Sequence, residues 1–248
     1  MPARPPRRRA AVLFDDEALL VLDKPSGTLA DAARGNPAPA APAVLGIANA
    51  EQLRAAFPLE LEASGVVVYA RTPAAAAALS KQVHDGRIER VFMALATGYV
   101  PEDGVVDARI EYHPGARRAR IVPVRGQRAV TEYAVTDRVA GHTWLTCRTT
   151  TAAPHQVRAH LAHAGFPLTV DPAYGGGRGI LLSTYKGNYR PNRRHEERPL
   201  IGRVTLHSLR ITLDHPLTGQ RLVCEAPVPK DLRATLGQLG RLKARGGD

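Results

Sequence analysis

Residues 155–160, with the sequence His-Gln-Val-Arg-Ala-His, carry the side chains of this chain that are best suited to chemistry. Proline precedes the segment and glycine follows it, which is typical of a helix start and a helix end, so we predict one short helix over about 154–164. His155 and Arg158 are three residues apart and would share one face of that helix. Their position beside the glycine-rich stretch 171–176 predicts an anion-binding site, with a solvated helix face as the alternative.

A second candidate group is the carboxylate of Glu60, which lies just before the apolar run 65–70. A carboxylate at the edge of a buried strand, the ring of Phe92 and the guanidinium of Arg158 can together form one site. In such a site the arginine would keep the carboxylate ionised, and the ring would offer a stacking face to a planar ligand.

Two other kinds of site are less well supported by the same residues. Glu60 and Glu62 could form a glycosidase pair, but such a site needs aromatic platforms for a sugar, and aromatic residues make up only 5% of the chain. The side chains of His155, His160 and His163 could bind a metal, but helical zinc sites favour histidines four residues apart, and the spacings here are five and three. We therefore expect no metal.

The elements that would position these residues are mostly strands. Apolar runs with or without alternation predict the strands, and Thr-Pro at 72–73 predicts a helix to about residue 83. A last helix is expected from 231 to about 242. The expected strands cover residues 12–14, 19–22, 65–70, 91–96, 105–110, 120–124, 130–135, 144–147, 204–207 and 209–213. Because they do not alternate regularly with helices, we predict an α+β fold with a central mixed, mainly antiparallel sheet flanked by helices.

The charge of the chain points to an anionic partner. The formal net charge is +11 and the pI is about 10.2, which suits a phosphate backbone or an anionic membrane surface. No run of eighteen apolar residues is present, and residues 1–9 have no apolar core of a secretory signal, so we expect no membrane partner and a cytoplasmic protein. Cys147 and Cys224 lie in separate apolar runs and are expected to be small core residues.

At 248 residues with 44% hydrophobic residues, the chain is long enough for a sizeable core. We predict a disordered basic arm over 1–10, one catalytic domain over 11–242 and a short tail over 243–248. The stretch 30–44, rich in alanine and proline, is expected to be a loop. A monomer is expected.

The order of several motifs resembles the RluA-type RNA pseudouridine synthases, from about residue 12 to 239. Each motif is weak by itself, and their order and spacing carry the resemblance. The matching segments are Leu-Val-Leu-Asp-Lys-Pro-Ser-Gly at 20–27, Ser-Gly-Val-Val-Val at 64–68, His-Gln-Val-Arg-Ala-His at 155–160, Asp-Pro-Ala-Tyr-Gly-Gly at 171–176, and the segments 197–207, 215–219 and 226–229.

The resemblance implies an isomerase that flips a uridine out of RNA, detaches the base from its ribose, turns it and reattaches it through carbon, without metal or cofactor. The family's aspartate, in a His-Arg-Leu-Asp segment, corresponds to Glu60 in Phe-Pro-Leu-Glu. The family's tyrosine corresponds to Phe92, and its Gly-Arg-Thr before the helix corresponds to Ala-Ala-Pro at 152–154. Arg158, the family's partner of the catalytic carboxylate, is retained.

The implied substrate is tRNA or rRNA, bound through backbone charge with the uridine flipped into the site. Basic stretches at 7–9, 117–120 and 190–198 would form a phosphate track if they lie on one side. The residues expected to contact RNA are Lys24, Arg117, Arg118, Arg120, His155, Gln156 and His160. Two hypotheses remain open: an active pseudouridine synthase with Glu60, Arg158 and Phe92 as catalytic residues, and a non-catalytic RNA-binding relative.

Overall fold

The structure is a computed structural model, and it describes residues 10–31, 39–50, 53–186, 189 and 196–246. The helices are α1 (Ala41–Val44), α2 (Pro73–His84), α3 (Gln156–His163) and α4 (Lys230–Gly246). The strands are β1 (Ala11–Asp15), β2 (Leu19–Lys24), β3 (Arg54–Ala55), β4 (Ser64–Ala70), β5 (Glu89–Thr97), β6 (Gly104–His113), β7 (Arg118–Val122), β8 (Gln127–Val139), β9 (His142–Thr149), β10 (Leu206–Asp214) and β11 (Arg221–Glu225).

The chain folds into two compact units, and each unit is formed by several separate segments of the chain. Unit 1 contains the chain up to Phe92 together with 149–154 and 207–227, and unit 2 contains 93–148, 155–206 and the chain from Val228. Strand β5 begins in unit 1 and continues into unit 2.

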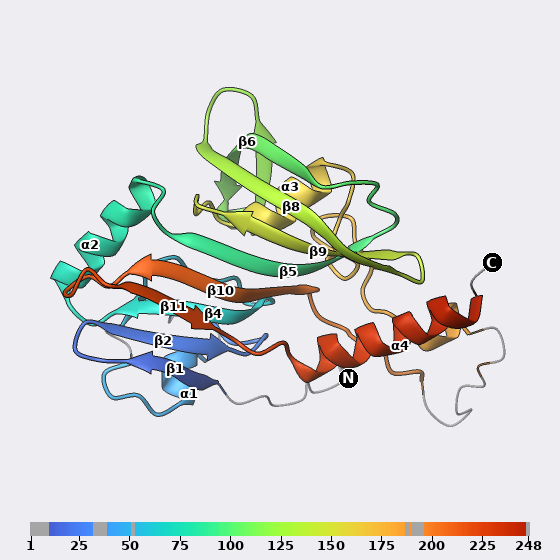
Figure 1. The fold of residues 1–248 in the computed structure, drawn as a ribbon, viewed down its shortest axis with the longest axis horizontal. Helices are drawn as coiled ribbons and strands as arrows, with labels where there is room; N and C mark the ends of the chain where they lie inside the picture. Colours follow the sequence, from blue (N-terminus) through green and yellow to red (C-terminus); the bar gives the residue numbers. More distant parts are fainter. Residues whose placement is uncertain (1–9, 32–38, 51–52, 187–188, 190–195, 247–248) are drawn as a thin grey trace. The chain divides into compact units, whose positions relative to one another are not determined.

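Unit 1 is built on strands β1, β2, β4 and β10, which lie side by side in that order, and on β11, which pairs with β10 outside this order (Figure 1). Three of these pairings are antiparallel, and β4 with β10 is parallel. Every residue of β2 is buried, as is β4 except for its last residue, which explains why both strands are continuous apolar runs rather than alternating ones. The core of the unit gathers apolar side chains from these strands and from α2, among them Leu19, Val68, Leu79 and Leu213.

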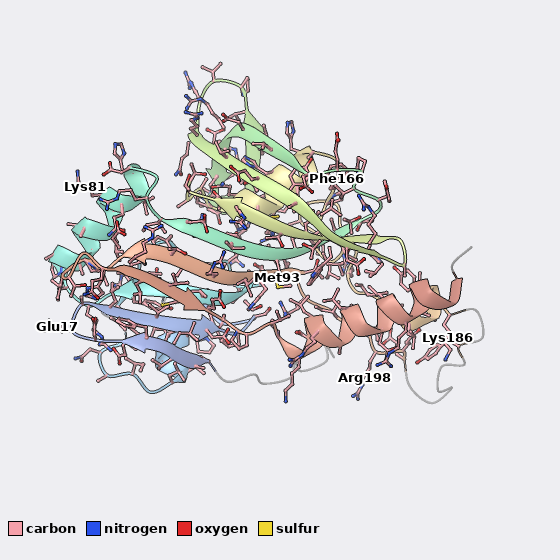
Figure 2. The ribbon with its side chains drawn as sticks, viewed as in Figure 1. Glu17, Lys81, Met93, Phe166, Lys186 and Arg198 are labelled. Atoms are coloured by element: carbon pink, nitrogen blue, oxygen red, sulfur yellow. The ribbon has the colours of Figure 1, made fainter. Side chains whose placement is uncertain are left out.

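Helix α2 of unit 1 begins with the cap that the sequence predicts. The hydroxyl of Thr72 accepts a hydrogen bond from the amide of Ala75 (3.1 Å), and proline occupies the first turn. Leu79 packs into the core, while Lys81 projects outward with a side chain that is 77% exposed (Figure 2).

Unit 2 contains an antiparallel array in the order β9, β8, β6, β7 (Figure 1). Helix α3 packs against β6, β7 and β8, and α4 packs against β8. The core of the unit includes Leu95, Trp144, Ile180 and Leu232, so the last helix closes a core built largely from strands.

The fold class is confirmed as α+β with a mixed, mainly antiparallel sheet. The predicted hairpin at 12–22, the buried strand at 65–70 and the helix after Thr72 are confirmed. The predicted basic arm lies outside the described residues except for Ala10. No helix in the described part of the chain is long and apolar enough to cross a membrane.

Three expectations about elements are wrong in detail. The helix predicted over 154–164 starts at Gln156, because His155 adopts a left-handed backbone conformation (φ 56°) that cannot continue a helix. The strands predicted at 204–207 and 209–213 are one strand, β10. The loop expected over 30–44 ends in the helical turn α1, in which proline occupies the first turn.

Candidate active site

The loop that carries Glu60 is held in unit 1 by the side chain of Lys24. This lysine is fully buried, and its ammonium donates to the carbonyls of Thr28 and Ala63 (both 2.8 Å), Pro25 (3.2 Å) and Leu61 (3.3 Å). Burying a charge is costly unless hydrogen bonds replace its water, and these four carbonyls do so. The backbone immediately after Glu60 is thereby tied to the turn at the end of β2.

Two more contacts join the same turn to this loop. The amide of Gly27 donates to the carbonyl of Leu61 (2.8 Å), and the hydroxyl of Ser26 donates to the carbonyl of Glu62 (2.6 Å). Glu60 itself is only partly buried, and the backbone that follows it is held by these contacts. Lys24 was predicted to contact RNA, and its observed contacts lead us to propose that it supports this loop instead.

The strand that follows Glu60 requires glycine at its second residue. Gly65 has φ 114°, and a Cβ at this position would come within 2.0 Å of the carbonyl oxygen of Ser208 on β10. At the neighbouring register position the hydroxyl of Ser64 shares a 3.0 Å hydrogen bond with Nδ1 of His207. The Ser-Gly pair of the motif therefore joins two parallel strands just after the candidate carboxylate.

Arg90, at the start of β5, lies near two aromatic rings of unit 1. Its guanidinium carbon is 5.4 Å from the ring centroid of Phe92 and 5.9 Å from that of Phe57, both within the range of cation–π attraction. The guanidinium also donates to the carbonyl of Thr151 (2.6 Å). Burial lowers the pKa of Arg90 to about 10, and the negative charge of Glu60 opposes that shift.

Arg158 is paired with a carboxylate of its own unit. In unit 2 its Nε and Nη2 donate to the two oxygens of Asp171 at 2.7 and 2.8 Å, and the two side chains are 3% and 0% exposed. This bidentate geometry is the strongest form of a charged hydrogen-bonded pair. It connects helix α3 to the loop of the Asp-Pro-Ala-Tyr motif.

The ring of Tyr174 completes this cluster. The guanidinium of Arg158 lies 5.0 Å from the ring centroid and that of Arg118 lies 5.2 Å from it. The tyrosine hydroxyl accepts from the amide of Ala119 (2.7 Å) and shares a 3.0 Å hydrogen bond with Nδ1 of His155. The predicted face that His155 and Arg158 share therefore exists, and within unit 2 it packs on an aromatic residue.

Gln156 and His160 fasten α3 to the strands of unit 2. The amide of Gln156 donates to the carbonyl of Val130 (2.9 Å) and to the hydroxyl of Thr131 (3.1 Å), and Nδ1 of His160 is 2.9 Å from the same hydroxyl. Nε2 of His160 is 3.2 Å from the carbonyl of Ala108. Burial lowers the pKa of His160, which keeps the imidazole neutral in this network. Both side chains are buried, and their predicted contact with RNA stays a prediction.

The three arginines of the basic stretch at 117–120 are exposed on unit 2. Arg118 and Arg120 flank the buried Ala119 along β7, so both side chains lie on the opposite, exposed face of that strand. Arg117 is also exposed, in a left-handed conformation at the turn before β7. Of the other basic stretches, residues 7–9 and 190–195 lie outside the described residues.

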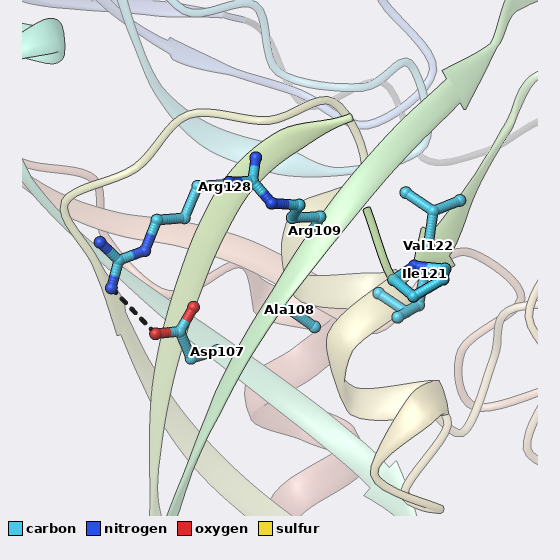
Figure 3. A pocket seen from close by; sticks show the side chains of 7 residues that line it. Asp107, Ala108, Arg109, Ile121, Val122 and Arg128 are labelled. Carbon is cyan, nitrogen blue, oxygen red and sulfur yellow. Dashed lines mark hydrogen bonds and ion pairs between the residues drawn. The ribbon is translucent and has the colours of Figure 1, made fainter. Parts of the chain in front are cut away.

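An open groove of about 470 Å³ lies beside this surface (Figure 3). Its apolar part is formed by Ala108, Ile121, Val122 and Pro123, and its charged part by Asp107, Arg109 and Arg128. Arg128 bonds Asp107 at 3.0 Å, as the dashed line in Figure 3 marks. An apolar floor edged by guanidinium groups suits a nucleotide, whose base is planar and whose phosphate is anionic.

Two charged residues with close partners, Arg90 in unit 1 and Asp171 in unit 2, were not anticipated from the sequence. Arg90 could have been found from its spacing, because it lies two residues before Phe92 on a strand and therefore points to the same face. Asp171 was noted only as part of a motif, since no local pattern connects it to Arg158. Glu60 and Arg158 belong to different units, and their pairing stays a prediction.

The comparisons with known proteins define the class. A family described as RNA pseudouridylate synthase matches residues 18–163, a range that includes Glu60, Phe92 and residues 155–160. The chain belongs to this family.

Among individual relatives, the chain is 33% identical to the ribosomal large subunit pseudouridine synthase D of Xanthomonas campestris pv. campestris, over 94% of this chain and 70% of that protein. It is 32% identical to the protein of the same name from Neisseria meningitidis serogroup B, over 94% of this chain and 62% of that protein. The chain thus spans roughly two thirds of the length of these relatives.

Two solved structures share the fold. Human RNA Pseudouridylate Synthase Domain Containing 4 superposes with a TM-score of 0.66 at 22% identity, covering 92% of each chain. Human RNA Pseudouridylate Synthase Domain Containing 1 has a TM-score of 0.64 at 18% identity, covering 89% of this chain and 84% of that one. At these identities the likeness concerns the fold alone.

Proposed function

We propose that this protein is an RNA pseudouridine synthase that isomerises uridine in ribosomal RNA of the large subunit. The observation that carries the proposal is the family match over residues 18–163, a range that contains the candidate carboxylate Glu60, the ring of Phe92 and the helix motif at 155–160. The relatives named above direct the choice of large-subunit rRNA as substrate, where the sequence alone left tRNA and rRNA open.

Glu60 would act as the nucleophile or base of the reaction. The isomerisation breaks the bond between N1 of the base and C1′ of the ribose and forms a bond between C5 and C1′. The hydrogen on C5 then leaves as a proton, and N1 gains one. A partly exposed carboxylate on a loop fixed through its backbone is suited to such a role, because the group is positioned without being enclosed.

Phe92 would stack on the flipped uracil without taking part in proton transfer. Its ring is 4% exposed and has no hydroxyl, so a proton relay through this position is absent. Glutamate reaches about 1.5 Å farther than aspartate, and a misplacement on the scale of 1 Å can cost about a hundredfold in rate. The proposal therefore includes a slower reaction than that of a family member with aspartate and tyrosine.

The arginines of β7 would bind the RNA backbone. Arg118 and Arg120 lie on one exposed face, beside the groove edged by Arg109 and Arg128. Each phosphate contact that is lost should lower the slope of log affinity against log salt by about one unit or slightly less. We also propose that the protein works as a monomer in the cytoplasm, where a nascent large-subunit rRNA is present.

The hypothesis that the protein is an active enzyme is tested by the release of tritium from large-subunit rRNA labelled at C5 of uridine. The unmodified chain should release tritium without added metal or cofactor, and Glu60→Gln should lower the rate on the order of 10³-fold or more. Glu62→Gln is the matched control, since it changes an exposed carboxylate two residues away and should leave the rate unchanged. Equal rates for Glu60→Gln and the unmodified chain would refute the role of Glu60.

A second candidate function, RNA binding without chemistry, is favoured by the ring without a hydroxyl at Phe92 and the longer acid at Glu60. It predicts no tritium release, and tight rRNA binding with a steep salt dependence that weakens in the double variant Arg118→Gln, Arg120→Gln. The two functions are separated by measuring both quantities on the same preparation. In vivo, the pseudouridine content of rRNA from cells with and without this protein distinguishes the same two functions.

A further inference from the structure

The exposed arginines of unit 2 are not all held in the same way. Arg128 donates to the carboxylate of Asp107 (3.0 Å), and Arg109 donates to a backbone carbonyl (3.1 Å). Within the described part of the chain, Arg118 makes neither kind of contact. Its guanidinium lies over the ring of Tyr174 instead, with the guanidinium carbon 5.2 Å from the ring centroid. Such a contact uses the face of the guanidinium and leaves the N–H groups at its edge available to an acceptor.

Tyr174 also fixes the backbone beside Arg118. Its hydroxyl accepts a hydrogen bond from the amide of Ala119 (2.7 Å), the residue that follows Arg118 on β7. The same hydroxyl shares a 3.0 Å hydrogen bond with Nδ1 of His155, whose ring centroid is 5.3 Å from that of Tyr112 on β6. One tyrosine therefore contacts both the side chain of Arg118 and the strand that carries it.

Tyr174 is itself held firmly within unit 2. It is 6% exposed, and the guanidinium of Arg158 lies 5.0 Å from its ring centroid. Arg158 is in turn fixed by its buried ion pair with Asp171. Because the ring under Arg118 cannot move freely, part of the conformational entropy of this arginine is lost during folding and not during binding.

An exposed arginine that is oriented in advance and has no acid partner suits a phosphate group. The planar guanidinium can bind two phosphate oxygens through two parallel hydrogen bonds, and this geometry requires a fixed orientation. Arg120 lies on the same exposed face of β7, but it stands opposite Glu111 of β6 in the register of the sheet. The two arginines of one basic stretch therefore differ in how well they are prepared to bind an anion.

We propose that Tyr174 is a positioning residue for RNA binding: it presents Arg118 to one phosphate of the bound RNA and makes this arginine a stronger backbone contact than Arg120. The inference rests on the proposed function, because it takes rRNA as the ligand. The motif at 171–176 then has two tasks within unit 2, since Asp171 holds Arg158 and Tyr174 holds Arg118.

The first test is the affinity for a large-subunit rRNA transcript, measured at several salt concentrations. We expect Arg118→Gln to weaken binding about tenfold and to lower the slope of log affinity against log salt by about one unit. Arg120→Gln should have a smaller effect on both quantities. Tyr174→Leu removes the ring and the hydroxyl, and it should reproduce most of the loss of affinity and slope of Arg118→Gln although it removes no charge.

Double variants distinguish positioning of Arg118 from a general structural role of Tyr174. Tyr174→Leu combined with Arg118→Gln should bind no more weakly than the weaker of the two single variants, because both changes remove the same contact. Tyr174→Leu combined with Arg120→Gln should show the two losses multiplied. Multiplied losses in both pairs, or in neither pair, would overturn the proposal.

The matched control is Tyr185→Leu. The hydroxyl of Tyr185 also contacts a histidine, at 2.5 Å from Nε2 of His142, and the two ring centroids are 5.5 Å apart. No arginine of the described segments lies over this ring, so the variant should lower stability without changing the salt slope. A change of slope equal to that of Tyr174→Leu would overturn the proposal.

A measurement on the unmodified chain keeps the proposal testable if Tyr174→Leu does not fold. Nitrogen-15 relaxation of the arginine Nε–H groups should give Arg118 an order parameter near about 0.85 and Arg120 a value below about 0.6. Equal order parameters for the two arginines would overturn the proposal.

The outcomes also separate this inference from the proposed function. Absence of tritium release together with the expected affinities would refute the proposed function alone, because none of these measurements needs turnover. Tritium release together with an unchanged affinity in Tyr174→Leu would refute the inference alone.

Discussion

Units 1 and 2 hold an arginine in two different ways. In unit 2, Arg158 and Asp171 are both nearly inaccessible and joined by two short hydrogen bonds, so each neutralises the other. In unit 1, the guanidinium of Arg90 lies near two aromatic rings and donates to a backbone carbonyl, while the acid of that unit, Glu60, is only partly buried. The first arrangement is a buried ion pair, and the second contains no ion pair among the contacts described above.

The comparison predicts opposite effects for the two acids. Asp171→Asn should lower the free energy of unfolding by about 3–5 kcal/mol, because it removes the negative charge that is paired with the buried guanidinium of Arg158. Glu60→Gln should change the free energy of unfolding by less than about 0.5 kcal/mol, as is usual for a partly exposed position. Urea unfolding of both variants measures this difference.

If Glu60→Gln destabilised the chain as much as Asp171→Asn, the Glu60 carboxylate would be a structural group. The distinction between the units would then be lost. The asparagine variant keeps the size of the side chain, so a cavity does not complicate the result.

Lys24 offers a second way to sharpen the comparison, because it is a buried cation of unit 1 whose ammonium donates to backbone carbonyls. Lys24→Met keeps the aliphatic part and removes the ammonium, which leaves the carbonyls of Thr28, Leu61 and Ala63 without this donor. We expect a loss of about 2 kcal/mol in unfolding free energy and a slower reaction, with RNA affinity unchanged.

Urea unfolding and filter binding of rRNA at several salt concentrations test this prediction. A weaker salt dependence of binding with unchanged stability would return Lys24 to the RNA-contact role that the sequence suggested. In that outcome the support of the Glu60 loop would rest on Ser26 and Gly27.

The smallest expected effect is a change in how the free energy of unfolding depends on pH, through two histidines of unit 2. Burial lowers the pKa of both His142 and His160 below the ordinary value of 6.5. As pH falls below about 6.5, the unfolded chain takes up protons at these positions that the folded chain does not, so the free energy of unfolding decreases. His160→Gln should make this decrease shallower, with His163→Gln as the control on the same helix.

Unfolding by urea between pH 7.5 and 5.5 measures the slope. A slope unaffected by His160→Gln would mean that this imidazole titrates alike in the folded and unfolded chain. The network of His160 with Thr131 and Ala108 would then not require the neutral ring.

Much of the fold could be predicted from local patterns. The buried strand β4, the hairpin of β1 and β2 and the cap of α2 follow from apolar runs, turn residues and Thr-Pro at 72–73. The start of α3 could not, because the left-handed conformation of His155 depends on contacts with residues far along the chain, such as Tyr174 and Tyr112.

The candidate site can be proposed from the sequence in part. Glu60 and Phe92 are proposed for it from motif order, and the motif that contains Asp171 is visible. The partners of Arg90, Lys24 and Asp171 could not be predicted, since each depends on which donor or acceptor lies within about 3 Å after folding.

The sequence by itself determined the class of this protein. The order of its motifs, its positive charge and the succession of predicted strands all follow from local sequence, without knowledge of the tertiary structure. Only the tertiary structure decided which charges neutralise each other and which remain available. The physical reason is that the energy of a charge depends on burial and on partners distant in sequence, such as Thr151 for Arg90 and Ala63 for Lys24.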